Sequence, residues 1–396
     1  MAKARDARMQ KTRRSRASMP SLCILHTGAA VPQMLLGAGC DRAGGAELQL
    51  SEIARRLRQR GWPVTFALYD SRNDTERATD DGIRLLSAAS PAGGLPGLRF
   101  LTHTVPTNWH LIARGDADVY LQMGVGWQNA LLAWRCRSDS RRFVLWLASI
   151  TDPLCDDPRD SRLAAHERWL ARYGLRHADA IVAQTRDQQK LLRQRHGRDS
   201  VLIRNIWALG DSEASAPADP AEVFWAATMR PLKRPHMFLD VAEALPEIRF
   251  VMAGGPADDD CGFYDEVESR AQRTSNVDFL GFVPFREIDK YYARASAYLC
   301  TSTIEGFPNT FLQSWSHGRP VVSTFDPDGV ISAYDIGFHC RDADELISAV
   351  EVACENTRDY LEATRDYLRR HHSPEVIMPQ VETVLFGEQP GGGQLV

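Results

Sequence analysis

Short apolar runs of strand length alternate along the chain with longer segments of helical spacing. In the first half we predict strands at 22–27, 64–69, 98–102, 118–122, 143–148, 180–184 and 201–204. Between them, apolar residues three and four positions apart predict helices at 47–59, 162–176 and 186–195. Strands that alternate with helices form parallel sheets, and such sheets bind ligands at the carboxyl ends of their strands.

A change in composition divides the chain into two parts. Residues 211–220 are small and polar and carry prolines, which is typical of a linker. A second alternating series follows, with strands predicted at 223–227, 249–253, 277–280, 297–301 and 320–323 and a helical stretch at 346–370. We therefore predict an α/β protein with two Rossmann-like, doubly wound domains, residues 21–210 and 221–372, each built on a parallel sheet.

Composition narrows the class of protein. A chain of 396 residues is too long for a single domain with one hydrophobic core. A content of 44% hydrophobic and 25% charged residues is that of a soluble globular protein. The formal net charge of −4 gives no overall attraction to nucleic acid. The eight cysteines lack metal-site spacing and are expected to be reduced thiols in the cytoplasm. The longest nearly apolar run, 120–134, is too short and too polar to span a bilayer.

The first twenty residues are strongly basic. This segment, residues 1–20, carries Lys3, Arg5, Arg8, Lys11, Arg13, Arg14 and Arg16 against the single acid Asp6. One interpretation is a disordered tail or an upstream start artefact. The other is a polybasic patch for peripheral contact with an anionic inner membrane surface, where each cation contributes about 1 kcal/mol.

The chemically most informative segment joins a predicted strand to a helix that begins near Asn309. Gly306 lets the backbone approach a ligand closely, and Pro308 pre-sets the first helical turn. The amides from Asn309 and Thr310 onward then face a space where the helix dipole favours an anion such as a diphosphate. Glu305 has the wrong charge for phosphate, so we expect it to accept hydrogen bonds from sugar hydroxyls. A capping Glu in an ordinary turn is the alternative.

Two further segments place anion-binding groups at strand ends. Gly44 and Gly45 open the predicted helix after the first strand, where paired glycines allow a close backbone approach. The loop 228–235 carries Arg230 and Lys233 at the end of another strand, where cations require solvent or an anion. A simple helix-entry turn and a solvated basic loop are the respective alternatives.

The run Glu305-Gly306-Phe307-Pro308-Asn309, followed by Gly318-Arg319-Pro320-Val321-Val322, resembles the donor-site signature of glycosyltransferase family 4, whose members are retaining enzymes with the GT-B fold. The resemblance implies that the domains face each other across a cleft, and that residues 373–396 cross back to the first domain before a disordered tail. It implies transfer of a hexose from a UDP- or GDP-linked sugar to a glycan or lipid-linked acceptor, in cell-surface or exopolysaccharide synthesis. We expect no cofactor and no metal, since no convincing Asp-x-Asp pair is present.

The resemblance also assigns roles to single residues. Lys233 matches the family's phosphate-binding lysine, and Glu305 would hold the donor sugar. Gly44 and Gly45 would face the diphosphate from the first domain. The remaining donor-binding set is Gly255, Phe282, Val283, Gly306, Phe307, Asn309, Thr310 and Gln313, with Phe282 and Val283 placed against the nucleotide base.

Three departures from the family pattern leave other functions open. Gln313 stands where the family has a second Glu on the ribose hydroxyls, so it can accept a hydrogen bond but carries no charge. Thr228 replaces an Arg, for which Arg230 would compensate, and the segment 120–124 lacks a His near the acceptor. A catalytically silent glycan-binding or scaffold protein is therefore an alternative. A sugar-nucleotide epimerase is another, although we find no acid and base cluster for it.

Asp152 is the remaining catalytic candidate. It follows the predicted strand 143–148, where its carboxylate would point into the cleft and orient an acceptor hydroxyl. The competing interpretation is a turn or capping Asp before Pro153. Thr185 is expected to cap the helix 186–195.

Overall fold

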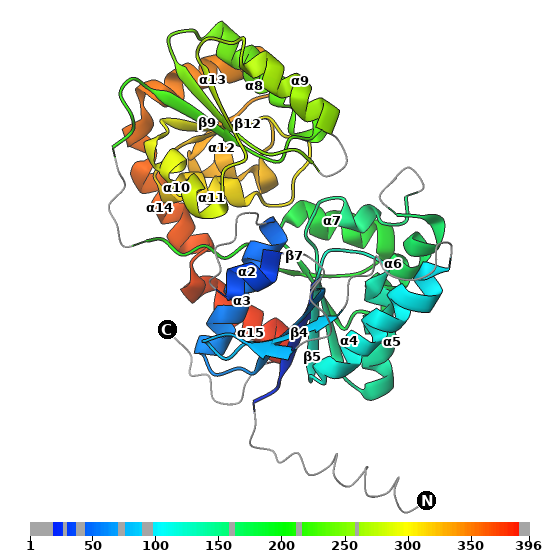
Figure 1. Ribbon diagram of the computed structural model, residues 1–396. Helices are drawn as coiled ribbons and strands as arrows, with labels where there is room; N and C mark the ends of the chain where they lie inside the picture. The colour runs from blue at the N-terminus through cyan, green and yellow to red at the C-terminus, as the bar shows by residue number, and fades with distance from the viewer. Residues whose placement is uncertain are drawn as a thin grey trace, which may run out of the picture.

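The computed structural model describes residues 19–26, 30–36, 44–69, 76–88, 98–157, 163–210, 216–257 and 261–387. Its strands form two separate sheets, one from each half of the chain (Figure 1). The prediction of an α/β fold with two parallel sheets is confirmed. The proposed limits of the domains, 21–210 and 221–372, stay a prediction, and most of the basic segment and the chain end after 387 lie outside the described residues.

The first sheet has the order β3-β4-β2-β1-β5-β6-β7-β8. Its strands are β1 (Leu22–Leu25), β2 (Val64–Tyr69), β3 (Glu76–Ala78), β4 (Arg84–Ala88), β5 (Val119–Met123), β6 (Arg142–Trp146), β7 (Ala180–Ala183) and β8 (Val201–Leu202). Every pairing is parallel except that of the edge strand β3 with β4.

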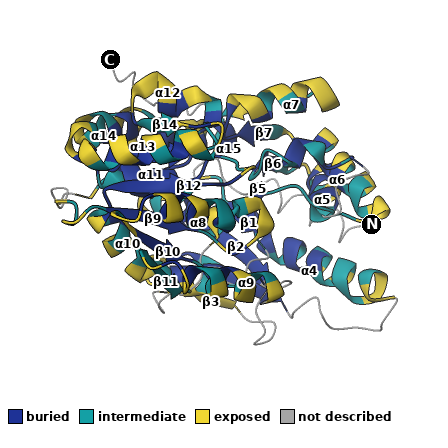
Figure 2. Cartoon of the chain, turned by 90° about the horizontal axis from the view of Figure 1, so that it is seen from above, coloured by how far each residue is buried: buried dark blue, intermediate teal, exposed yellow. Residues whose placement is uncertain are grey.

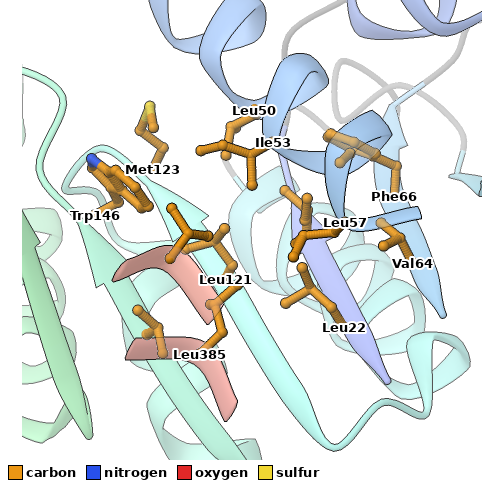
Figure 3. Packing of buried hydrophobic residues seen from close by; sticks show 14 of the residues in the cluster. Leu22, Leu50, Ile53, Leu57, Val64, Phe66, Leu121, Met123, Trp146 and Leu385 are labelled. Atoms are coloured by element: carbon orange, nitrogen blue, oxygen red, sulfur yellow. The ribbon is translucent and has the colours of Figure 1, made fainter. Parts of the chain in front are cut away.

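Both faces of this sheet are buried, which explains why its central strands are apolar throughout. Leu22 and Ile24 of β1 point to one face, and Cys23 and Leu25 point to the other. The first face is covered by α2 (Ala30–Leu35), α3 (Gly45–Gln59) and α15 (Pro374–Phe386). Figure 3 shows Leu50, Ile53 and Leu57 of α3 packed over the strands. The second face is covered by α4 (Val105–Gly115), α5 (Gln128–Asp139), α6 (Ala165–His177) and α7 (Arg186–His196).

The second sheet has the order β11-β10-β9-β12-β13-β14 and is parallel throughout. Its strands are β9 (Glu222–Ala226), β10 (Arg249–Ala253), β11 (Val277–Gly281), β12 (Ala297–Cys300), β13 (Val321–Ser323) and β14 (Gly337–His339). One face packs against α8 (Pro235–Ala244), α9 (Cys261–Ala271) and α13 (Ala343–Glu355). The other packs against α10 (Phe285–Arg294), α11 (Asn309–Ser316), α12 (Val330–Tyr334) and α14 (Tyr360–His371). The central strands of both sheets are buried, and the covering helices carry exposed residues on their outer sides (Figure 2).

The last helix returns to the first sheet. Ile377, Met378 and Leu385 of α15 belong to the same buried cluster as β1 and α3, and Figure 1 shows α15 beside α3. Trp62 stacks on Phe386 with ring centroids 3.8 Å apart. Burial of these side chains ties the end of the chain to the first domain.

Two expectations about local structure were wrong. The run 98–102 is not a strand: Phe100–Thr104 forms a short helical turn, η1, that leads directly into α4. The strand position beside β2 is taken by β4 instead, and Phe100 packs its ring on Trp127 at 5.0 Å. The stretch 346–370 is two helices, because Thr357–Asp359 forms a 3-10 turn between α13 and α14. None of the helices in the described part of the chain has the length and apolarity needed to cross a bilayer.

Candidate active site

A cavity of about 630 Å³ lies between the two sheets, with residues of both domains in its wall. From the first domain it is lined by the start of α3 and the ends of β6 and β7, and from the second by the ends of β9, β10, β11 and β12 with the start of α11. Strand ends and helix starts therefore surround one space, as expected for parallel sheets. The predicted residues that line it are Gly44, Gly45, Arg230, Lys233, Gly255, Phe282, Val283, Glu305, Gly306, Phe307, Asn309, Thr310 and Gln313.

Lys233 and Glu305 form an ion pair in this wall. Lys233 Nζ donates to Glu305 Oε1, and the two side chains are 21% and 18% exposed. Lys233 is held at the end of a short turn, η3 (Pro231–Lys233), where Thr301 Oγ1 donates to the Lys233 carbonyl at 2.6 Å. The structure thus brings together the lysine predicted for phosphate and the carboxylate predicted for sugar hydroxyls, 72 residues apart in sequence.

The other cations of this loop differ in role. Arg230 is exposed and lines the cavity together with Thr228. This position is compatible with the prediction that Arg230 compensates for the arginine that the family has in place of Thr228. Arg234 turns away: its guanidinium donates to the Thr301 carbonyl at 2.6 Å and to Thr324 Oγ1 at 2.5 Å. It fixes the loop against β12.

Gly306 lies at a close approach of the two domains. A Cβ atom at this position would lie 2.7 Å from the Ala148 carbonyl oxygen and 3.2 Å from Gln184 Oε1, both in the first domain. Gln184 Oε1 also accepts from the Phe307 amide at 3.4 Å. A side chain at 306 would force the domains apart, so the glycine permits the closed wall.

Asn309 connects the domains through its side chain. Its Nδ2 donates to the Gly45 carbonyl at 3.0 Å, and its Oδ1 accepts from Gln49 at 3.0 Å and from Asn205 at 2.9 Å. Asn205 Nδ2 also donates to the Phe307 carbonyl at 2.9 Å. The side chain of Asn309 is therefore engaged in the protein itself, which leaves its place at the first turn of α11 as the feature that a ligand would use.

Contrary to what the sequence had led us to expect, the backbone amides at Gly44 are not all open to an anion. The Gly44 amide donates to Glu47 Oε2 at 2.7 Å, so the carboxylate of the first helical turn caps its own helix. Glu47 also lies 3.7 Å from His26 Nε2, at the end of β1. Gly45 approaches the second domain, since a Cβ there would lie 3.0 Å from Asn309 Nδ2.

An apolar end of the cavity is built by residues after β10 and β11. A Cβ on Gly255 would lie 3.2 Å from Phe282 Cβ, so the two turns are in contact. Ring and aliphatic residues that sequence reasoning missed extend this wall: Phe285, Ile288, Tyr292 and Tyr298. Burial raises the pKa of the Tyr292 and Tyr298 hydroxyls well above the usual value, so both stay neutral. Gln313 is 6% exposed and lines the same cavity.

Asp152 is not among the residues that line the cavity, and its contacts favour a structural role over the predicted catalytic one. It is 4% exposed, and its Oδ2 accepts from the amides of Ala148 at 2.6 Å and Ser149 at 3.1 Å. The carboxylate thus holds the turn after β6, which is the competing interpretation. Thr185 caps α7 as expected, accepting from the Gln188 amide at 3.1 Å.

Sequence reasoning also missed the amide side chains Gln49, Gln184 and Asn205. Gln184 stood in a segment already noted at a strand end, whereas Gln49 lies inside a helix and Asn205 in an apolar stretch. These three side chains are 4% exposed or less, and buried polar side chains usually have hydrogen-bond partners. Their burial would have indicated a role in the site, but it is not visible in the sequence. Among the described residues, no group of three or more His, Cys, Asp or Glu side chains is placed to hold a metal ion.

Two family models match the chain. Residues 44–206 match the glycosyl transferase 4-like domain, and residues 220–356 match the glycosyl transferases group 1. Among curated proteins, D-inositol 3-phosphate glycosyltransferase from Mycobacterium tuberculosis strain H37Rv is 25% identical over 162 residues, 37% of this chain. The match spans about a third of that relative, 34% of its length.

Several solved structures share the fold over almost the whole chain. Sucrose-phosphate synthase from Thermosynechococcus elongatus aligns with a TM-score of 0.76 and 16% identity, covering 92% of this chain and 98% of that one. HepE from Anabaena, in complex with UDP and glucose, aligns with a TM-score of 0.68 and 18% identity over 92% and 98%. Trehalose-6-phosphate synthase OtsA aligns with a TM-score of 0.70 and 11% identity over 92% and 98%. These likenesses show the fold.

Proposed function

Because the chain belongs to the group 1 glycosyltransferases of GT-B fold, we propose that it transfers a hexose from a nucleoside diphosphate sugar to a hydroxyl acceptor, with retention at the anomeric carbon. The observation that carries this proposal is the Lys233–Glu305 pair beside the start of α11 in the interdomain cavity. A cation and a helix start favour a diphosphate, and a carboxylate next to them suits sugar hydroxyls.

In this proposal the departing diphosphate is stabilised electrostatically. Lys233 and the first-turn amides of α11 at Asn309 and Thr310 bind its oxygens, with Arg230 contributing from the exposed edge of the loop. Charge that develops on the leaving oxygen meets fixed donors, which is the usual basis of such catalysis. We propose that no metal is needed, and the assays below include Mg²⁺ as a test of this point.

Glu305 is proposed to hold the donor sugar hydroxyls rather than to attack the anomeric carbon. The bond between the anomeric carbon and the phosphate oxygen breaks, the acceptor oxygen bonds to the same face of that carbon, and the acceptor proton passes to a leaving phosphate oxygen. This route requires no enzymatic nucleophile. Gly44, Gly45 and the turn after β6 form the opposite wall, where the acceptor would enter.

The nucleotide is proposed to be bound by the turns at Gly255 and at Phe282 and Val283, with Gln313 near the ribose. A UDP-linked sugar is the first donor to test, because HepE, which shares the fold, was solved with UDP and glucose. A glycan or lipid-linked acceptor in cell-surface or exopolysaccharide synthesis is part of the proposal. So is a cytoplasmic location, supported by six free cysteines among the described residues.

The test is a calorimetric screen of the purified protein against UDP, GDP, ADP and their sugar conjugates, with and without Mg²⁺, followed by product analysis. We expect one nucleotide to bind. Lys233→Ala should reduce the kcat/KM of transfer by about 10²- to 10³-fold, the loss of about 2.7–4 kcal/mol of transition-state stabilisation. The matched control is Lys290→Ala, whose side chain is 58% exposed on α10. Unchanged transfer in Lys233→Ala would contradict the proposal.

A catalytically silent glycan-binding protein is a second candidate, favoured by Gln313 and Thr228 at positions where the family carries charge. It predicts glycan binding without donor binding or hydrolysis in the same screen. An epimerase would instead change the free sugar nucleotide without an acceptor.

A further inference from the structure

The side of the first domain away from α3 and α15 carries large apolar side chains in solvent. Leu98 is 55% exposed, Leu101 68%, Trp134 54% and Trp169 67%. They lie at residues 98–104, on α5 and on α6, the elements that cover the second face of the first sheet with α4. Figure 1 shows α4, α5 and α6 grouped on one flank of this domain. Exposed tryptophans are uncommon on a surface that only meets water.

Packing within these elements joins the exposed side chains into one surface. The ring centroids of Trp109 on α4 and Trp134 on α5 lie 4.7 Å apart, and Arg135 Cζ lies 5.0 Å from the centroid of the Trp109 ring in a cation–π contact. On α6, Trp169 and Tyr173 lie 6.1 Å apart. The first two contacts join α4 to α5, and the third lies within α6.

Further contacts connect the ends of this surface. Phe100 contacts His166 of α6 at 5.3 Å, and Arg137 of α5 donates to His177 Nδ1 of α6 at 2.9 Å. The inner residues of the same helices, such as Leu132 and Leu175, are fully buried in the core. The outer surface is therefore not required to complete the fold. We call it the aromatic–basic face, made of residues 98–104 and the outward side chains of α4, α5 and α6.

This face is basic although the whole chain has a net charge of −4. Its exposed cations are Arg99, Arg137, Arg172 and Arg176. The carboxylates of the same elements, Asp139 and Glu167, are engaged locally: Asp139 pairs with Arg135 at 2.8 Å, and Glu167 accepts from the Ala164 amide at 2.8 Å. The face thus presents guanidinium groups around apolar rings.

We propose that the aromatic–basic face binds the surface of an anionic lipid bilayer. Tryptophan rings partition into the boundary between headgroups and acyl chains, and arginines bind lipid phosphates bidentately. The protein would rest on the membrane through this face without inserting a helix. The charge pattern favours this occupant over a second copy of the chain, because two such basic faces would repel each other. The proposal does not depend on the transferase activity.

The experiment is sedimentation of the full-length protein with vesicles of phosphatidylcholine, alone or mixed with phosphatidylglycerol, at low and high salt. We expect binding to the anionic vesicles that weakens as salt screens the arginines. The double variant Arg172→Glu/Arg176→Glu should lower the partition coefficient by about tenfold or more. Trp134→Ala/Trp169→Ala should lower it as well at either salt concentration, because the apolar contact is not screened.

The matched control is Arg358→Glu/Arg369→Glu, which changes the net charge equally at exposed positions of the second domain and should bind as the wild type does. Circular dichroism melts check that each variant folds. Absence of wild-type binding would overturn the proposal. Equal binding by all variants would overturn it too and assign binding to the basic residues before 19. Loss of a dimer in the tryptophan variant, with vesicle binding unchanged, would identify the face as a contact between copies.

Discussion

Replacing Glu305 by Gln should affect nucleotide binding and sugar transfer in opposite directions. In the structure Glu305 pairs with Lys233, and a diphosphate bound by Lys233 would have to compete with this carboxylate. The carboxylate would also repel the diphosphate. Glu305→Gln removes both penalties while it keeps the size of the side chain and an acceptor oxygen for sugar hydroxyls.

The magnitude follows from the exposure of the pair. Two unit charges 4 Å apart attract by about 4 kcal/mol at an effective dielectric of 20, while fully exposed pairs gain only about 0.2–1 kcal/mol. The two side chains are about a fifth exposed, at 21% and 18%. A net penalty of about 1.4 kcal/mol lies between these limits, so Glu305→Gln should bind UDP about tenfold more tightly. Transfer should still fall by about 10²-fold or more, because the charge that holds the sugar in the transition state is lost.

Calorimetry with UDP and initial-rate assays with the UDP-sugar measure the two effects separately. Glu287→Gln is the matched control: this carboxylate is 46% exposed on α10 and pairs with Lys290. It should change neither quantity. Weaker binding of UDP to Glu305→Gln would refute the reasoning, since it would mean that Glu305 orients Lys233 for the phosphate instead of competing with it.

Three further predictions concern other parts of the site. Gly306→Ala should reduce transfer at least tenfold with less effect on UDP binding, because its Cβ would lie 2.7 Å from the Ala148 carbonyl oxygen across the cavity. Steady-state kinetics and calorimetry measure the two effects separately, and unchanged kinetics would contradict the inference that the domains must approach closely at residue 306. Gln313→Glu should tighten nucleotide binding by about 1 kcal/mol, or roughly fivefold, because a charged acceptor strengthens a ribose hydrogen bond. Calorimetry measures this change, and weaker binding would instead indicate the cost of burying the charge. Burial lowers the pKa of His372 from 6.5 to about 3, so the folded protein keeps this ring neutral while the unfolded chain takes up a proton below pH 6.5. Stability should therefore fall as the pH drops from about 6.5 toward 3, by at most about 1.4 kcal/mol per pH unit. His372→Gln should flatten that slope in urea titrations, and an unchanged slope would contradict the prediction.

The central strands of both sheets were predictable from the sequence because they are buried on both faces, whereas β3, β4 and β14 were not predicted. Apolar runs such as 22–25 and 297–300 are typical of the middle of a covered parallel sheet. The run 98–102 shows the limit of this signal. It is apolar as well, but the chain passes from it into α4 through Val105 and Pro106, and β4 takes the strand position beside β2. Which apolar segment pairs with β2 is decided by tertiary contacts.

The candidate site was predictable where a local motif carries the chemistry. Glu305, Gly306 and Lys233 lie on loops whose residues suit a ligand, and all three line the cavity. Asp152 was a weaker case, since a carboxylate after a strand suits a turn as well as a ligand, and its hydrogen bonds to the amides of Ala148 and Ser149 favour the turn. The contacts of Gln49 and Asn205 with Asn309 span 260 and 104 residues, and nothing local in the sequence indicates them.

The chemistry of the contacts that close the cavity differs from one end to the other. Around Asn309 they are made by neutral amides of Gln49 and Asn205, and bonds of this kind contribute only about 0.5–1.5 kcal/mol each. At the start of α7 the contact is ionic: Asp328 Oδ1 accepts from the Arg186 amide at 2.8 Å, and Asp328 Oδ2 lies 3.5 Å from Arg204, with the Asp328 side chain 1% exposed. Breaking a buried charged contact costs more than breaking a neutral one. Of these two contacts, the one at Gly45 and Asn309 therefore separates at lower cost, and it is also the side on which α3 and α11 face the proposed diphosphate. A transferase must admit a donor and release a nucleotide at every turnover, and weak neutral contacts at that point of the wall suit this requirement.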